Sequence, residues 1–348
     1  MKKFLSLILA LLLTFSLLAL ASCGEHVHKY GAYIVDGDEH YKQCIIDDCD
    51  YISFKDTHLF SQGVCVICAC EEVLDQTANP ESLGALSAKI KDGAVITLTP
   101  GTYSSSLRLT SKKNVTIKGQ NGVVFTDNIK LDATCENIVI ENITFDKGVP
   151  TSSSVEAGGI RILNDVDGLT IRNCEFNNYA HIRVVLTSAF TNGIKDLVIE
   201  NCRFFDQAYG EGASSLYMGC TIENVTIKDC VFRNIQHNAV QLSGVVKGNV
   251  NFINSTYEDI GHRFFNINNA PNVNWNITGN KFYMATVEVY GQYFKGSKDS
   301  GTAFNIGVNY WEVIPELDPY YFCLYDSESK TYVTDGITYD EEAQLTIQ

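Results

Sequence analysis

A pattern of alternating apolar and polar residues recurs along the middle of the chain. Its clearest copies are the phrases LTIRNCEF at 169–176, LVIENCRF at 197–204 and VTIKDCVF at 225–232. The alternation, followed by an Asn or Asp just before the cysteine, predicts a short β-strand and then a bend. Such a strand cannot bury its apolar side alone, so we expect successive copies to stack on one another.

The phrase continues in both directions with other residues in place of the cysteine. The equivalent positions are Gln120, Ile143, Cys174, Cys202, Cys230, Ser255 and Asn280. Neighbouring positions are 23 to 31 residues apart, a period typical of solenoids. The sequence therefore predicts an all-β solenoid in which the cysteines stack inside the corner after each strand and do not form a redox site.

These repeats resemble right-handed parallel β-helices of the pectin-lyase-like superfamily, over roughly residues 80 to 285. The segment 92–103, followed by VTIKG at 115–119, is similar to the first coil of that superfamily. Its members include pectate and alginate lyases, glycoside hydrolases, epimerases and non-catalytic adhesins, so the resemblance implies a fold without selecting a function. We divide the chain into a signal peptide (1–22), a His/Cys-rich module (23–75), the right-handed parallel β-helix (76–285) and a C-terminal cap or tail (286–348).

The periodicity fades after Phe282, and aromatic residues accumulate. The stretch Asn309-Tyr310-Trp311 resembles the closing segment of bacterial surface β-helices. We therefore expect this region to cover the last coil, because a solenoid needs protection at its open end.

The first 22 residues have the composition of a secretory signal. Lys2 and Lys3 precede a nearly unbroken apolar run from residue 4 to 20. The run ends in Leu20-Ala21-Ser22-Cys23, which resembles a bacterial lipoprotein box with Cys23 as the lipidated residue. The resemblance implies a protein held by lipid at the extracellular face of the bacterial cell membrane. The alternative is an ordinary signal peptide with an incidental cysteine.

The charge of the chain limits its partners. The net charge is −15, and it becomes −17 if the signal, with its two lysines and no acids, is removed. An acidic chain of this kind does not favour nucleic acid or anionic lipid as the main partner. We expect a monomer.

Histidines and cysteines are concentrated before the repeats. The cysteines follow the spacing Cys44-x4-Cys49, then 15 residues, then Cys65-x2-Cys68, which is close to a zinc ribbon. A segment this short cannot bury enough apolar surface to fold unaided, so metal or disulfides are required. We predict one structural zinc held by these four thiolates, with His40 or His58 as a substitute or supporting ligand. Disulfide pairing and unpaired thiols are the alternatives, and Cys70 is left unassigned.

A second column of residues follows the repeat aromatics. His181, His237 and His262 each come five residues after an aromatic and immediately before another predicted strand. Period-two alternation turns them outward together with residues of the neighbouring strands. These additional outward residues are Arg161, Arg183, Tyr217, Gln241 and Asn266.

This outward face suits an acidic polysaccharide. Arginine binds carboxylate or sulfate through paired hydrogen bonds, tyrosine stacks on sugar rings, and histidine transfers protons near neutral pH. We expect polysaccharide binding without catalysis, because no complete catalytic set is present. A polysaccharide lyase or glycoside hydrolase, with His237 or His262 as the base, is the first alternative. A structural or protein-adhesion role, with the histidines packed into corners, is the second.

Overall fold

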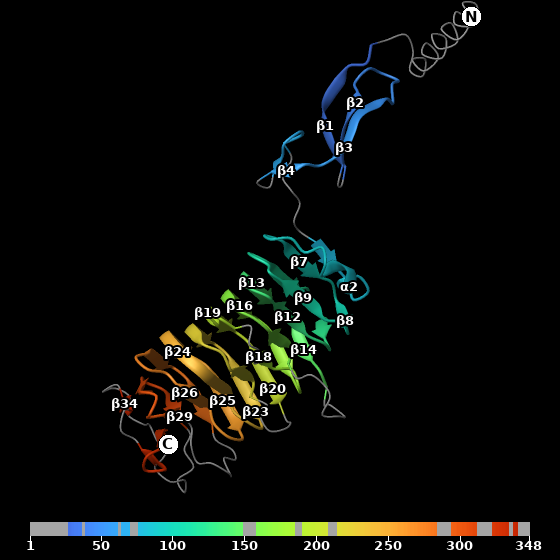
Figure 1. The fold of residues 1–348 in the computed structure, drawn as a ribbon. Helices are drawn as coiled ribbons and strands as arrows, with labels where there is room; N and C mark the ends of the chain where they lie inside the picture. The colour runs from blue at the N-terminus through green and yellow to red at the C-terminus, as the bar shows by residue number, and fades with distance from the viewer. Residues whose placement is uncertain are drawn as a thin grey trace, which may run out of the picture. The chain divides into compact units, whose positions relative to one another are not determined.

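The computed structural model describes residues 27–36, 39–61, 64–69, 76–148, 158–184, 190–207, 214–283, 294–311, 322–333 and 337–339. The chain divides into two compact units, Met1–Val73 and Leu74–Gln348, which are described separately here (Figure 1). The predicted signal peptide and Cys23 lie outside the described residues. Within those residues no helix is long and apolar enough to cross a membrane.

The first unit is built on a small antiparallel sheet. Its strands β1 (Tyr30–Asp36), β2 (Glu39–Cys44) and β3 (Ile52–Thr57) pair in that order. A second antiparallel pair, β4 (Phe60–Ser61) and β5 (Val64–Cys65), follows. Among the described side chains of this unit, the buried ones are His40, Cys44, Cys49 and Cys65. The interior of the unit therefore consists of potential metal ligands and not of an apolar core.

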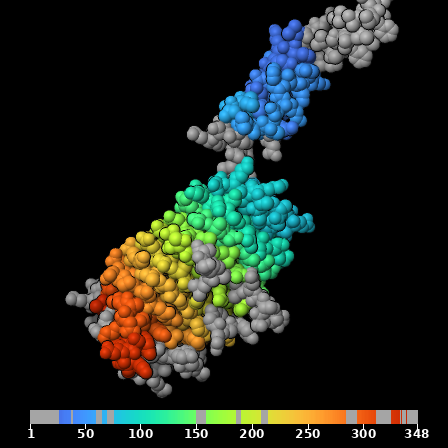
Figure 2. Space-filling model, in the orientation of Figure 1, coloured from blue at the N-terminus to red at the C-terminus, as the bar shows by residue number. Residues whose placement is uncertain are grey.

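The second unit is a parallel β-solenoid, which confirms the predicted fold class. Each coil contributes one strand to each of three faces, and each strand pairs with its counterparts in the neighbouring coils. Figure 1 shows this stacking for β13, β16 and β19. In Figure 2 the colour advances along the solenoid in bands, as expected where each coil contacts its neighbours in sequence.

The strands are grouped by face. The first face contains β7 (Val95–Leu98), β10 (Thr116–Gly119), β13 (Cys135–Glu141), β16 (Val166–Arg172), β19 (Ile194–Glu200), β22 (Ile222–Lys228), the second half of β24 (Val240–Ile253), β27 (Asn274–Thr278), β30 (Phe304–Ile306) and β34 (Ile337–Tyr339). The second face contains β8 (Gly101–Tyr103), β11 (Val123–Phe125), β14 (Thr144–Asp146), β17 (Glu175–Asn177), β20 (Arg203–Gln207), β23 (Val231–Ile235), β25 (Thr256–Ile260), β28 (Lys281–Tyr283) and β31 (Tyr310–Trp311). The third face contains β9 (Leu107–Thr110), β12 (Ile129–Asp132), β15 (Ile160–Ile162), β18 (Ile182–Val184), β21 (Leu216–Met218), the first half of β24, β26 (Phe265–Asn269), β29 (Phe294–Ser297) and β32 (Phe322–Asp326). The remaining elements are β6 (Gln76–Ala78) and α2 (Leu83–Leu86) before the first coil, and β33 (Thr331–Val333), which pairs antiparallel with β32.

The repeat aromatics form a continuous stack through the interior of the solenoid. The stack consists of Tyr103, Phe125, Phe145, Phe176, Phe204, Phe232, Tyr257 and Phe282. Neighbouring ring centroids lie 4.6 to 5.7 Å apart, close to the spacing of about 4.8 Å between parallel strands. All eight rings are fully buried. Each coil therefore adds one paired strand and one stacked ring to the same interior.

The predicted cysteine column is confirmed as an inward stack. Cys174, Cys202 and Cys230 are buried, and each thiol donates to a backbone carbonyl of the preceding coil at 3.6 to 3.8 Å. The bend before each of them is a left-handed residue, for example Asn173 with φ 54° and Asn201 with φ 50°, a conformation that Asn tolerates better than most residues.

The solenoid extends beyond the predicted end at residue 285. Asn309 continues the inward column, because its side-chain amide donates to the carbonyl of Ile277 at 2.9 Å. The next two residues form β31, which pairs in parallel with β28. The stretch that resembled a closing segment is thus a further copy of the repeat.

Candidate functional site

The first unit contains two groups of potential metal ligands. His40, His58, Cys65 and Cys68 form group one, and His28, Cys44 and Cys49 form group two. Within each group all the ligand atoms lie within 4.8 Å of one another. The predicted site with four thiolates around one ion is therefore wrong in its grouping, although its six predicted ligands all belong to one group or the other.

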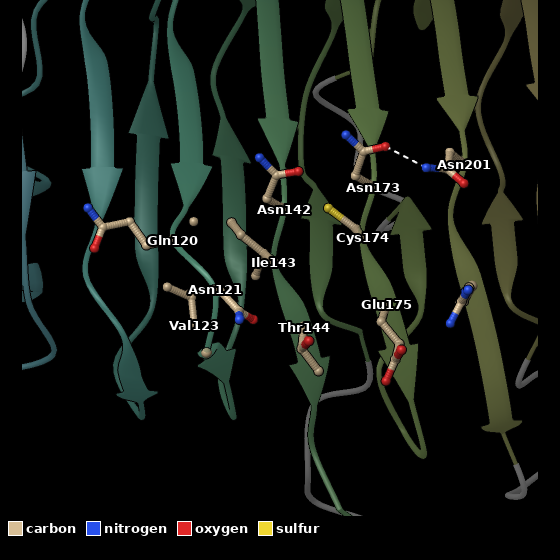
Figure 3. A pocket seen from close by; sticks show the side chains of 13 residues that line it. Gln120, Asn121, Val123, Asn142, Ile143, Thr144, Asn173, Cys174, Glu175 and Asn201 are labelled. Atoms are coloured by element: carbon tan, nitrogen blue, oxygen red, sulfur yellow. Dashed lines mark hydrogen bonds between the residues drawn. The ribbon is translucent and has the colours of Figure 1, made fainter.

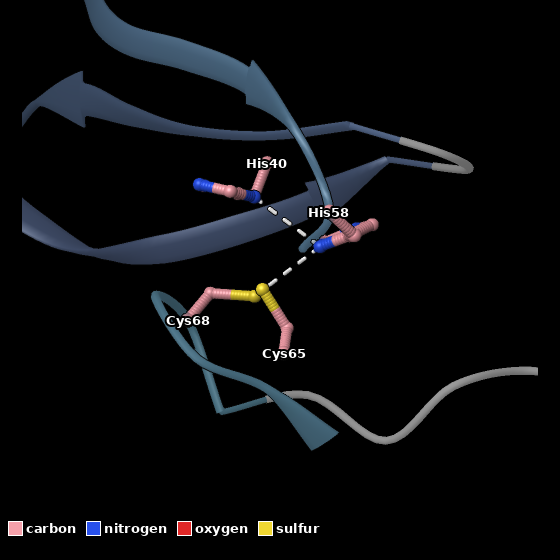
Figure 4. Close-up of side chains that lie close together, drawn as sticks. All are labelled: His40, His58, Cys65 and Cys68. Carbon is pink, nitrogen blue, oxygen red and sulfur yellow. Dashed lines mark hydrogen bonds between the residues drawn. The ribbon is translucent and has the colours of Figure 1, made fainter. Parts of the chain in front are cut away.

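The four side chains of group one converge on one point (Figure 4). The His40 Nδ1 atom lies 3.2 Å from His58 Nδ1, which lies 3.4 Å from the Cys68 sulfur. A tetrahedral zinc with ordinary bond lengths would separate two nitrogens by about 3.3 Å and a nitrogen from a sulfur by about 3.6 Å. The two separations are close to the edges of such a tetrahedron, and all four ligand atoms lie within 4.8 Å of one another, so these residues are near enough to hold one ion.

The Cys65 thiol is prepared for binding a cation. Burial alone would raise its pKa, but the backbone N–H groups of Cys68 and Ile67, with hydrogen bonds from His58 and the Cys68 thiol, lower the pKa to about 5. Cys65 is therefore a thiolate at neutral pH, which is the form that coordinates metal.

Group two lies at the other end of β2. The Cys49 sulfur is 3.4 Å from His28 Nδ1, and the His28 ring stacks on Tyr51 with centroids 4.3 Å apart. Cys44 and His40 are on the same strand, four residues apart, and both are buried. Four residues of extended strand span about 13 Å, so these two residues cannot ligate one ion. This spacing is consistent with His40 and Cys44 belonging to different groups.

The cysteines of the two ligand groups lie beside histidine nitrogens. Cys49 Sγ is 3.4 Å from His28 Nδ1, and Cys68 Sγ is 3.4 Å from His58 Nδ1. Cys70 lies outside the described residues. The close approach of thiol and imidazole ligand atoms favours the metal alternative over disulfide pairing.

The predicted outward column is in register on the third face. Backbone pairing places Arg161 beside Arg183, and the column continues from there through Tyr217, Gln241 and Asn266. The Arg183 guanidinium lies over the Tyr217 ring at 5.2 Å. We call this column of outward positions the face ladder.

The face ladder is longer and more basic than predicted. Arg108 and Lys130 precede Arg161 in register, and Lys295 follows Asn266. The same alternation could have revealed Arg108 and Lys130, because each lies between two apolar residues of its strand. The four consecutive coils before β21 therefore each place a basic residue on the third face, from Arg108 to Arg183. Arg108 forms an ion pair with Asp132.

A buried lysine adds to this positive region. The Lys147 side chain is only 5% exposed, and its Nζ lies 3.2 Å from Asn128 Oδ1 and 3.9 Å from the Asp127 carboxylate. Burial lowers the pKa of Lys147, Asp127 raises it, and Arg161 and Lys130 lower it further. The pKa of Arg161 is likewise lowered by burial and by Arg183. Positive charge is thus concentrated around β12, β15 and β18.

Two predicted members of the outward face are buried. His181 is 1% exposed, its Nδ1 lies 3.3 Å from Gln207 Oε1, and burial lowers its pKa to about 4. Period-two alternation failed here because His181 precedes β18 and lies in the corner, where Ala180 and Ile182 are buried as well. Asn266 keeps its ladder register but is 8% exposed, so it is covered and does not face solvent.

The two candidate catalytic histidines form a corner network. The rings of His237 and His262 lie 4.2 Å apart, and His237 Nδ1 is 3.0 Å from Ser214 Oγ and 2.9 Å from Asn238 Nδ2. Burial, followed by the charges of His262 and Arg263, lowers the pKa of His237 to about 4.

The same network orients Gln241 of the face ladder. Its Oε1 accepts hydrogen bonds from Ser214 Oγ at 2.8 Å and from Asn238 Nδ2 at 3.0 Å. These contacts favour the corner role of the histidines and leave Gln241 Nε2 donating to Ser243 at 3.1 Å.

A shallow groove of about 490 Å³ follows a different corner, between the first and second faces (Figure 3). Amide side chains line it, including Asn142, Asn173 and Asn201, and Asn201 donates to Asn173 at 2.7 Å. Sequence reasoning treated these residues only as bends. The groove is polar and mostly neutral, in contrast to the positive face ladder.

Comparison with known proteins finds no matching family model and no curated protein that matches this chain. The chemistry available to the chain must therefore be inferred from its own side chains. The ligand atoms of the two groups lie close enough to hold metal ions, and the face ladder places basic side chains in consecutive coils.

Proposed function

We propose that this protein binds an acidic polysaccharide along the face ladder of its solenoid. The observation that carries the proposal is the column of basic residues in consecutive coils, in a chain whose net charge is −15. A local positive column in an acidic protein concentrates anionic ligands there and repels them elsewhere. Arginine side chains then bind carboxylate or sulfate groups through charge-assisted hydrogen bonds.

The spacing of the face ladder supports a polymeric ligand. Successive ladder residues are one strand apart, about 4.8 Å, which is of the order of one sugar unit in an extended chain. A polysaccharide lying along the solenoid would meet one side chain per coil. Tyr217 beside Arg183 supplies a ring surface next to the charge, and Gln241 offers an oriented amide.

Binding without bond cleavage is the form that we favour. A base must reach the proton that it removes, and His237 Nδ1 is close to Ser214 and Asn238. A pKa of about 4 also makes His237 a weak base at neutral pH. Lyase or hydrolase activity is therefore the alternative that the experiment must test.

We propose zinc as the metal of the first unit and lipid on Cys23 as the anchor. Two thiolates with two imidazoles form a ligand set typical of structural zinc sites. The apolar run ending in LASC supports a lipoprotein at the extracellular face of a bacterial membrane. Membership of the pectin-lyase-like superfamily is part of the same proposal.

The test of polysaccharide binding compares two arginines. The full chain is run through gels containing polygalacturonate or alginate, with a neutral glucan as the control polymer. We expect retardation by the acidic polymers alone, weakening as salt is added, and a loss of about tenfold in affinity on Arg183→Ala. Arg233→Ala removes the same charge from the second face, where Arg233 pairs with Glu258, and should leave retardation unchanged.

The same samples distinguish binding from catalysis. Unsaturated products formed by the wild type and lost on His237→Ala would favour the lyase alternative. Equal weakening by Arg183→Ala and Arg233→Ala would show that only net charge matters and would overturn the site. Replacement of Cys23 by Ser should release the protein from the membrane fraction or leave an uncleaved precursor.

A further inference from the structure

We infer that the groove between the first and second faces binds an uncharged N-acetylated oligosaccharide, at a site separate from the face ladder. Its lining residues come from four successive coils, between Gly119 and Arg203, so the groove is about 14 Å long. Its volume of about 490 Å³ lies within the range of about 300 to 1,000 Å³ that is typical of ligand sites. The inference does not depend on the binding of an acidic polymer, because no residue of the face ladder lines this groove.

A row of amide side chains follows the groove. Figure 3 shows one amide at the end of each of four neighbouring strands of the first face, namely Gln120, Asn142, Asn173 and Asn201. The three asparagines share a left-handed bend with φ between 50° and 58°, so each coil places its amide at the equivalent position. Successive amides are therefore about 4.8 Å apart in backbone spacing, which is of the order of one sugar unit. An extended peptide instead repeats its side-chain direction about every 6.8 Å and does not keep register with the row.

The amide row has hydrogen-bonding capacity that the fold does not use. Asn201 Nδ2 donates to Asn173 Oδ1 at 2.7 Å, which leaves the Asn173 nitrogen as a donor and the Asn201 oxygen as an acceptor. In the part of the chain that the structure describes, the side-chain amides of Gln120 and Asn142 have no hydrogen-bond partner in the protein. An amide offers a donor and an acceptor side by side, so a second amide in the ligand can satisfy both at once.

The groove also has an apolar surface and no net charge. Val123 and Ile143 line it beside the amides. Its two charged lining residues, Glu175 and Arg203, have opposite signs and are neighbours in register on the second face. An acetamido group combines one amide with one methyl group and has no charge, so it complements the amides and the apolar surface together. A sugar with only hydroxyl groups lacks the methyl, and a uronate or sulfate finds no excess of positive charge here.

The test compares two uncharged tetrasaccharides that differ at one substituent of each ring. Titration calorimetry of the full chain with tetra-N-acetylchitotetraose should show binding about tenfold tighter than with cellotetraose, which has hydroxyl groups in place of the acetamido groups. Binding in this groove should not weaken as salt is added, in contrast to binding at the face ladder.

A matched pair of variants locates the site. Asn142→Gly removes one amide of the row and should weaken binding of the N-acetylated tetrasaccharide about tenfold. Glycine suits the left-handed bend, and Gly279 already occupies the equivalent bend of a later coil. Asn254→Gly is the control, because Asn254 has the same bend and does not line the groove. Gln120→Ala repeats the test at an exposed position, with the same expected loss.

Four outcomes would overturn the inference. Absence of binding, or equal affinity for the two tetrasaccharides, would do so, and so would equal losses in Asn142→Gly and Asn254→Gly. Tighter binding of N-acetyl-tetraalanine amide than of either sugar would mean that the groove takes polypeptide. Weakening by Arg183→Ala alone would assign the ligand to the face ladder. Because Asn142→Gly should leave retardation by acidic polymers unchanged, this inference and the proposed function can fail independently.

Discussion

The two units of this protein have interiors of opposite chemistry. The solenoid buries a continuous stack of aromatic rings with aliphatic residues around it. The described side chains buried in the first unit are one histidine and three cysteines, while Phe54, Leu59 and Val66 are more than half exposed. The solenoid is stabilised by a repeated apolar core. We expect the first unit to depend instead on a metal ion held by its ligand groups. The following predictions test this contrast, from the largest expected effect to the smallest.

Metal removal should unfold the first unit and leave the solenoid folded. Structural zinc contributes about 10 to 16 kcal/mol to small metal-dependent domains, more than a unit without an apolar core can replace. Hydrogen exchange with and without a strong chelator should show protection lost at residues 27–69 and kept at residues 95–283. If the first unit stays protected after metal removal, its stability does not depend on metal and the proposed difference between the two units is wrong.

Truncation of one stacked ring should destabilise the solenoid alone. Phe204→Ala removes a fully buried ring between Phe176 and Phe232, and we expect a loss of about 3 to 5 kcal/mol in unfolding free energy. Phe205→Ala is the matched control, because the adjacent ring lies on the outer side under Arg233 and should cost less than about 1 kcal/mol. Guanidinium unfolding monitored by circular dichroism measures both values. Equal losses would mean that the stack does not dominate stability.

Acid should weaken the solenoid through His181. This histidine is neutral in the folded state with a pKa of about 4, whereas its unfolded value is 6.5. The unfolded chain therefore gains a proton first as the pH falls, so the contribution is complete above pH 6.5 and is lost as the pH falls towards 4. The loss amounts to at most about 3 kcal/mol. His181→Gln should show a smaller decrease in unfolding free energy between pH 7 and pH 4.5 than the wild type. Identical slopes would contradict the assignment.

The two units also differ in how far they could be predicted from sequence. The solenoid was predictable because every coil repeats one phrase, so Phe176 and Cys174 could be placed inward by comparison with their equivalents. In the first unit the predicted ligands all fall in the two ligand groups, but the cysteine spacing did not indicate how they group, and His28 was not among them. The grouping depends on how the fold brings residues distant in sequence together, for example His40 with Cys65 and Cys68.

The remaining incorrect or missed predictions concern residues that depart from the regular repeat. His181 was misplaced because alternation holds within β18 and not in the corner before it. Lys147 carries no strand signal, since it follows β14, and it joins the positive region only through folding. Asn309 was missed as a repeat because its phrase ends in Trp311 where most others have phenylalanine.

The continuation of the repeat at Asn309 has a consequence for how such a protein can change over evolutionary time. Each coil adds one strand to each face, and an extra coil forms the same kinds of contact with its neighbours as the existing coils do. Duplication of one 23- to 31-residue segment would therefore lengthen the face ladder by about 4.8 Å without requiring any new fold. The length of the outer surface of the solenoid can thus change through the number of coils alone.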